Sequence, residues 1–86
     1  MSLKIAVLGG GCANCHNLEV NTRAALVQLG IDAEVEHVSD PAKYARYGLL
    51  FTPGLVVNDK LVSAGRVPAV NEVFTLLVNE LAASEG

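Results

Sequence analysis

The chain is predicted to fold as an α/β protein with a four-stranded mixed sheet flanked by helices. Three observations predict this class: a continuously apolar run leads through glycines into a helical pattern, two apolar runs flank a short Asn-Asp turn, and an amphipathic segment closes the chain. The predicted order is strand, helix, strand, helix, strand, strand, helix (βαβαββα). The first two strands, which are joined through a helix, are expected to be parallel with a right-handed crossover. The last two, which are joined by a two-residue turn, are expected to be antiparallel.

The first half of the chain predicts a strand–helix–strand unit. Residues 4–8 are almost wholly apolar, as expected of a central strand that is covered on both faces. Apolar residues recur at helical spacing between Cys12 and Leu29, and Gly30 stands where a glycine commonly ends a helix. Residues 31–38 alternate between apolar and acidic side chains, which predicts a half-exposed strand at an edge of the sheet.

The second half predicts a short helix, a hairpin and a closing helix. The short helix begins with the Asp-Pro pair at 40–41, because aspartate caps a helix N-terminus and proline fits its first turn. Residues 55–57 and 60–62 flank a two-residue turn. The closing helix is predicted to open at Pro68. Its apolar residues form one stripe: Val70, Val73, Phe74, Leu77, Val78 and Leu81.

The composition indicates one folded domain over residues 1–86. Of these residues 51% are hydrophobic and 17% are charged, and the formal net charge is −3. An acidic balance argues against a nucleic-acid groove, which needs a basic face, and no apolar run approaches the roughly 20 residues of a membrane-spanning helix. No signal peptide is recognisable, so the expected location is the cytoplasm. There a close cysteine pair is more typical of a redox or metal site than of a structural disulfide.

Both cysteines lie in the segment GGGCANCHN, residues 9–17, at the predicted junction of strand and helix. Glycines at such a junction can cradle a phosphate, but the Lys-[Ser/Thr] pair of a P-loop and the third glycine of a dinucleotide-binding motif are missing. The letters C-x-x-C-H also spell a haem attachment motif, although Met1 is the sole methionine and aromatic residues are few. His16 is therefore interpreted as a first-turn residue that could tune the thiols.

A soft-metal site is the main alternative. Two thiolates suit copper(I) or zinc, but only His16 and His37 could complete a zinc site, and His37 is interpreted as an ordinary strand residue. The first half of the chain resembles the heavy-metal-associated domain of copper chaperones and metal-transporting ATPases. It departs from that domain at Gly10, where the family has methionine, and the chain ends in a helix. A copper-binding or carrier module is the alternative function.

The spacing of the cysteines also suits a redox disulfide. A helix N-terminus carries partial positive charge and unsatisfied N–H groups, so a cysteine at Cys12 becomes a thiolate more readily. Cys15 lies one turn further on the same face, within reach of a disulfide bond to Cys12. This arrangement provides an exposed attacking thiol and a more buried resolving thiol.

Three segments together resemble the thioredoxin superfamily, in particular its small, glutaredoxin-sized redox-active disulfide proteins: AVLGGGCANC, TPGLVVNDKLVSAGRV and the closing helix. The resemblance implies a thiol–disulfide oxidoreductase with Cys12 as nucleophile and Cys15 as resolving thiol, acting without a metal or organic cofactor. It implies a cis bond between Thr52 and Pro53, with Thr52 beside Cys12 and its backbone offered to a substrate chain. The implied partners are a disulfide-containing protein substrate and an upstream thiol reductase.

The sequence departs from these relatives at several places. Ala13 and Asn14 stand where thioredoxin has Gly-Pro between its cysteines, and residues 5–8 contain no charged residue of the kind often buried beneath the thioredoxin disulfide. Gly11 stands where thioredoxin has a tryptophan before the first cysteine. Residues 64–67 read Ala-Gly-Arg-Val, where glutaredoxins carry a Gly-Gly-x-Asp signal for glutathione. The resemblance therefore does not extend to glutathione as a partner.

Overall fold

The computed structural model describes residues 3–10 and 13–85, and within them it contains the predicted elements in the predicted order. They are β1 (Lys4–Leu8), α1 (Ala13–Leu29), β2 (Glu34–Val38), α2 (Pro41–Arg46), β3 (Gly54–Val57), β4 (Lys60–Ala64) and α3 (Val70–Glu85). The strands of the described chain form one sheet in the order β2–β1–β3–β4. Because β1 runs parallel to β2 and antiparallel to β3, the sheet is mixed, which confirms the predicted α/β class.

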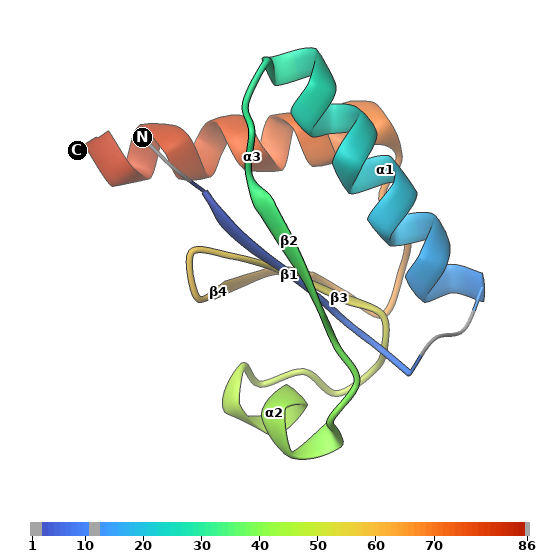
Figure 1. The fold of residues 1–86 in the computed structure, drawn as a ribbon. Helices are drawn as coiled ribbons and strands as arrows, with labels where there is room; N and C mark the ends of the chain where they lie inside the picture. Colours follow the sequence, from blue (N-terminus) through green and yellow to red (C-terminus); the bar gives the residue numbers. More distant parts are fainter. Residues whose placement is uncertain (1–2, 11–12, 86) are drawn as a thin grey trace.

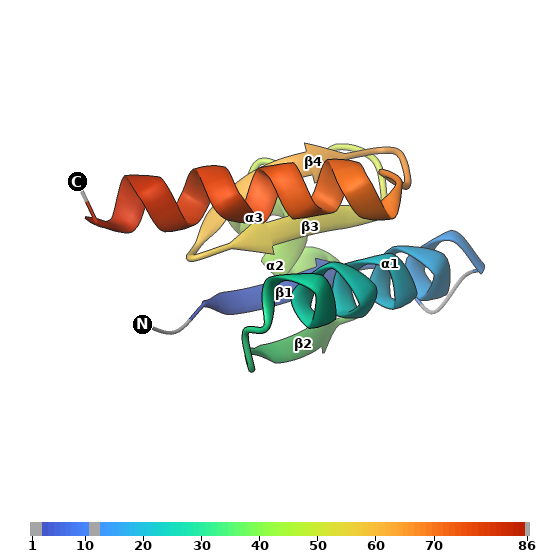
Figure 2. The ribbon, with the colours of Figure 1, turned by 90° about the horizontal axis from the view of Figure 1, so that it is seen from above.

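Helices cover both faces of the sheet. Figure 1 shows α1 and α3 on one face and α2 on the other. Figure 2 shows α1 and α3 lying alongside each other, and the two helices are in contact. β1 lies inside the sheet and between the two helical layers. This position explains why its sequence is apolar without alternation.

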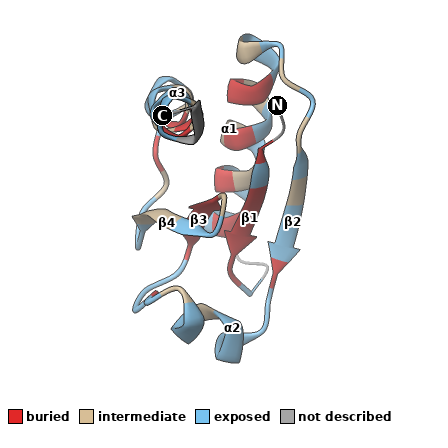
Figure 3. Ribbon diagram, turned by 90° about the vertical axis from the view of Figure 1, so that its left-hand side faces the viewer, coloured by how far each residue is buried: buried red, intermediate tan, exposed pale blue. Residues whose placement is uncertain are grey.

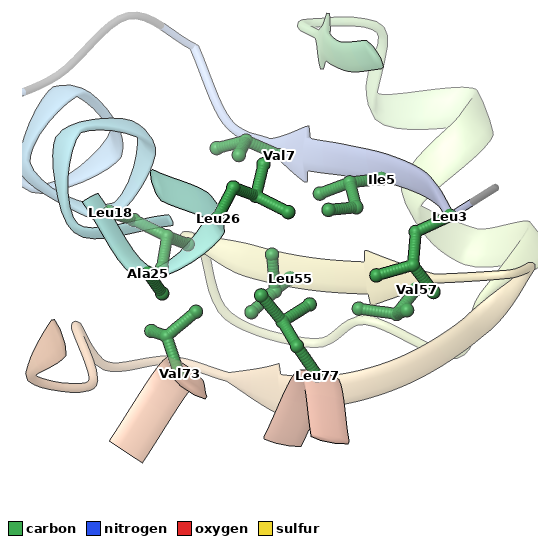
Figure 4. Packing of buried hydrophobic residues seen from close by; sticks show 10 residues of the cluster. All are labelled: Leu3, Ile5, Val7, Leu18, Ala25, Leu26, Leu55, Val57, Val73 and Leu77. Atoms are coloured by element: carbon green, nitrogen blue, oxygen red, sulfur yellow. The ribbon is translucent and has the colours of Figure 1, made fainter. Parts of the chain in front are cut away.

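The larger part of the core lies between the sheet and the pair α1 and α3. Figure 4 shows Leu77 pointing from α3 toward Leu55 and Val57 of β3, while Val73 points toward Ala25 of α1. The other members of this cluster come from β1, from the residue before it and from α1: Leu3, Ile5, Val7, Leu18 and Leu26. The apolar stripes predicted for both long helices are thus the faces that pack on the sheet. Val78 is the exception, because it is 39% exposed and its inclusion in the stripe of α3 was wrong.

A smaller cluster fills the space between the sheet and α2. Its buried members are Ala6, Leu8, Val38, Leu49 and Val56, and two tyrosines of the α2 region pack against them. Figure 3 shows β1, apart from Lys4 at its start, and β3 buried, whereas β2 is largely exposed. Within the described residues β2 also lies at an end of the strand order, with β1 as its single neighbour, which confirms the predicted half-exposed edge strand.

Several element boundaries differ from the sequence prediction. The hairpin strands are longer than predicted, because β3 already begins at Gly54 and β4 continues to Ala64. β2 begins at Glu34 rather than at residue 31, because the Ile31 N–H donates to the Leu26 carbonyl oxygen at 3.1 Å and still belongs to the C-terminal turn of α1. α3 begins at Val70, two residues after Pro68. Gly30, with φ +69°, ends α1 in the left-handed conformation, as predicted.

The β3–β4 hairpin turns at Asn58 and Asp59, which confirms the predicted two-residue turn. Their φ angles are +52° and +67°, the left-handed values of a type I′ turn. No helix within residues 3–10 and 13–85 is long and apolar enough to cross a bilayer.

Asp40 caps α2, and its removal is expected to destabilise the protein slightly. Its Oδ1 accepts a hydrogen bond from the Ala42 N–H at 3.0 Å. Replacing Asp40 by alanine is expected to lower the free energy of unfolding by about 1 kcal/mol, because an N-terminal N–H loses its acceptor. Asp40→Asn keeps an acceptor and should retain most of that stability in urea unfolding. An equal loss in both variants would contradict a capping role.

Candidate functional site

The ends of several strands meet at one edge of the sheet. This edge runs across the strand ends and is distinct from the two edge strands, β2 and β4. Leu8, the last residue of β1, lies opposite Val38 of β2 and Gly54 of β3, and Gly54 lies opposite Ala64 of β4. The segments that follow β1, β2 and β4 therefore leave the sheet where the segment before β3 enters it. The N-terminal end of α1 lies on the same side of the molecule (Figure 1).

Backbone hydrogen bonds hold two segments at this edge. The Gly9 N–H donates to the Val38 carbonyl oxygen at 2.9 Å, and the Gly65 N–H donates to the Pro53 carbonyl oxygen at 2.9 Å. Gly9 directly follows Leu8, and Pro53 directly precedes Gly54, the residue of β3 that is paired with Leu8. The pairing of β1 with β3 therefore brings the turn before the cysteines and the proline segment to the same edge.

Cys15 is fully buried in the first turn of α1. A Cβ atom built on Gly9 would lie 2.1 Å from its Sγ and 3.1 Å from its Cβ. The sulfur thus packs directly on the backbone of the turn that follows β1, and it occupies the space that any side chain at Gly9 would need. From the sequence alone, these glycines were expected only to provide a flexible turn.

Cys12, the predicted nucleophile, lies outside the described residues. In the sequence it directly precedes Ala13, the first residue of α1. Its role and its proximity to Thr52 therefore stay predictions. His16 is exposed, as expected of a solvated residue in the first turn.

Thr52 and Pro53 enter the sheet together at the start of β3. Thr52 is exposed and Pro53 is buried, and the peptide bond between them is cis. Thr52 is therefore the accessible member of the pair, whereas the Pro53 carbonyl already accepts from the Gly65 N–H.

His37 is a residue of this edge that sequence reasoning missed. Its Nε2 lies 3.0 Å from the Gly9 carbonyl oxygen, and its Nδ1 lies 4.0 Å from Oε1 of Glu19 in α1. The sequence interpretation treated it as an ordinary strand residue. The available signal was its place near the end of a strand predicted to run parallel to β1, since the ends of parallel neighbours meet at the same edge.

Two large apolar side chains at this edge were also missed. Leu50 and Phe51 are 85% and 74% exposed and directly precede Thr52. Phe51 lies beside the loop after β4, because a Cβ atom built on Gly65 would lie 3.3 Å from the Phe51 Cβ. Exposed apolar side chains grouped in this way are typical of surfaces that bind other molecules.

Within the described residues no group of three or more His, Cys, Asp or Glu side chains is arranged to hold a metal ion. A hollow of about 290 Å³ lies at the C-terminal end of α1, between Arg23, Val27 and Asp32. It includes none of the predicted site residues that the structure describes, which lie at the other end of α1 and at the edge of the sheet introduced above.

The fold and the residues at this edge define a thioredoxin-like α/β protein, and comparison with known proteins gives the same class. Residues 3–78 match the thioredoxin domain family. The chain is 43% identical over 75 residues to the thioredoxin of Methanothermobacter thermautotrophicus, which covers 87% of this chain and 97% of that protein. It is 36% identical over 69 residues to the thioredoxin of Methanocaldococcus jannaschii, covering 80% of this chain and 79% of that protein.

The chain belongs to the thioredoxin family. This membership supports, in general terms, a thiol–disulfide oxidoreductase that acts on disulfide substrates together with a reductase.

Proposed function

We propose that this protein is a thiol–disulfide oxidoreductase that uses Cys12 and Cys15 as its dithiol/disulfide pair. The observation that carries the proposal is the burial of the Cys15 sulfur in the first turn of α1, against Gly9, in a chain of the thioredoxin family. A buried thiol three residues after another cysteine is suited to resolve a mixed disulfide rather than to meet the substrate first.

In the proposed reaction the Cys12 thiolate attacks one sulfur of a substrate disulfide. A bond forms between Cys12 and that sulfur, and the other substrate sulfur leaves as a thiolate that takes up a proton. Cys15, after losing its proton to solvent, attacks the Cys12 sulfur, so that the Cys12–Cys15 disulfide forms and the second substrate thiolate leaves. Two electrons pass from the protein to the substrate, and an upstream thiol reductase restores them.

We further propose that Thr52 and Pro53 bind the substrate. Thr52 is exposed at the entry of β3, where its backbone can pair with an extended substrate segment as an added strand. Leu50 and Phe51, which precede it, offer apolar contacts to the residues beside the substrate disulfide. The proposed substrate is therefore a protein with an accessible disulfide in an extended, partly apolar segment.

The proposed reaction takes place in the cytoplasm, where reducing conditions keep a dithiol available. It uses no metal or organic cofactor, and residues 1–86 act as one thioredoxin-like domain.

Reaction with an aryl disulfide such as dithiobis(nitrobenzoate), which releases a coloured thiolate, tests the proposal. The wild-type protein is expected to release two equivalents in sequence, the first by attack of Cys12 and the second by resolution through Cys15. Cys12→Ser is expected to slow the first release at least about 100-fold, since the nucleophile is removed. Cys15→Ala is expected to release one equivalent and to keep the aryl thiol as an adduct visible by mass spectrometry.

The outcomes separate failure of the activity from failure of the role assignment. Wild-type release rates in both variants would contradict the proposed exchange reaction. An adduct in Cys12→Ser but not in Cys15→Ala would reverse the roles of the two cysteines. Anaerobic copper(I) titration provides a further check, because tight stoichiometric binding without disulfide exchange would favour a metal carrier instead.

A further inference from the structure

His37 joins three segments at the edge of the sheet that holds the cysteine turn. Its ring contacts the Gly9 carbonyl through Nε2, at 3.0 Å, and faces Glu19 through Nδ1, at 4.0 Å. The side chain itself is 41% exposed, so these contacts do not result from burial in the core. One side chain of β2 therefore reaches both the turn after β1 and α1.

The contact with the carbonyl fixes the orientation of the ring. A carbonyl oxygen only accepts, so Nε2 carries a hydrogen and donates it to Gly9. Nδ1 then faces the Glu19 carboxylate, whose other oxygen lies 3.4 Å from Nε of Arg23 on the same helix. The register partner of His37 on β1 is Val7, which is apolar. Among the described residues, the charged group that the ring faces is Glu19, with Arg23 behind it.

Gly9 is held at both of its backbone groups by neighbouring residues of β2. Its N–H donates to the Val38 carbonyl, and its own carbonyl accepts from His37. The same residue forms the wall on which the Cys15 sulfur packs, with 2.1 Å between Sγ and the place of a Gly9 Cβ. The position of Gly9 therefore limits where the Cys15 sulfur can lie.

We propose that His37 is a positioning residue for the resolving step: by anchoring the Gly9 carbonyl, it keeps the Cys15 thiol aligned for attack on the mixed disulfide of Cys12. This inference rests on the proposed exchange reaction and assigns to it a residue outside the cysteine motif. Without the anchor, the turn at Gly9 gains freedom and Cys15 samples unproductive orientations. The resolving step is expected to slow about three- to tenfold, the factor that one net hydrogen bond is worth, while the attack step changes little.

The two releases from dithiobis(nitrobenzoate) measure the two steps separately. His37→Ala is expected to slow the second release and to leave the first within about twofold of wild type. His37→Gln, whose longer amide can reach Gly9, is expected to restore the second release, whereas the shorter amide of His37→Asn is not. Glu36→Gln is the matched control, because Glu36 is exposed on the same strand and alternates to its opposite face.

Each outcome bears on one of the two proposals. If the wild-type protein gives no second release, the exchange reaction itself fails. If it gives both releases and His37→Ala resolves at the wild-type rate, the positioning role of His37 is wrong. Equal slowing of both releases without rescue by His37→Gln would show a general loss of structure and would also overturn it. If His37→Ala does not fold, the rates of the second release are compared between His37→Gln and His37→Asn. A faster second release in His37→Gln supports the positioning role, and equal rates overturn it.

Discussion

Replacing Leu77 by alanine is expected to lower the free energy of unfolding by about 2–5 kcal/mol, the range found when a fully buried leucine is truncated. Leu77 is fully buried and points from α3 toward Leu55 and Val57 of β3 (Figure 4). Its removal leaves a cavity between the helix and the sheet that rigid neighbours fill only in part. A small domain has about 5–15 kcal/mol of stability, so this single change removes a large share.

Urea unfolding at neutral pH measures the loss, and a matched control separates burial from side-chain chemistry. Leu50→Ala makes the same chemical change at a side chain that is 85% exposed, so it is expected to alter stability by less than about 0.5 kcal/mol. The dependence of the free energy on urea should be the same for both variants, since both unfold the same surface. Equal losses at the two positions would contradict the packing of α3 against the sheet.

The fold was predictable because the burial of each strand determines the pattern of apolar residues in its sequence. β1 is covered on both faces and is continuously apolar, whereas the edge strand β2 alternates. The Asn-Asp turn and the Asp-Pro helix start are local signals that act over a few residues. The start of β2 was misplaced because Ile31 has a strand-like side chain, while its N–H is bonded to Leu26 in the last turn of α1.

The candidate site was predictable only where its signals are local. The cysteine spacing and the Thr-Pro pair can be read from short segments. The contact between His37 and Gly9 cannot, because 28 residues separate them and only the parallel register of β1 and β2 brings them together. The close packing of Gly9 on Cys15 likewise depends on how α1 sits over the end of β1. Periodicity in the sequence does not determine that position.

Replacing Gly9 by alanine is expected to destabilise the protein by about 1–3 kcal/mol, the usual cost of overfilling a packed site. The new Cβ would lie 2.1 Å from the Cys15 Sγ. Rotation of the Cys15 side chain moves the sulfur away but leaves the Cys15 Cβ at 3.1 Å, so the start of α1 must also shift. The cause is steric rather than conformational, because Gly9 does not adopt a left-handed φ.

Gly10→Ala is the matched control, since a Cβ at Gly10 would meet no atom of residues 3–10 and 13–85 within 4 Å. A double-mutant cycle then tests whether the sulfur causes the loss. In a Cys15→Ala background the 2.1 Å overlap no longer exists, so Gly9→Ala is expected to cost less there by about 1 kcal/mol or more, a coupling typical of residues in direct contact. Additive losses would show that Gly9 acts on stability independently of the Cys15 sulfur. In that case Gly9 would not be the residue that positions the Cys15 thiol.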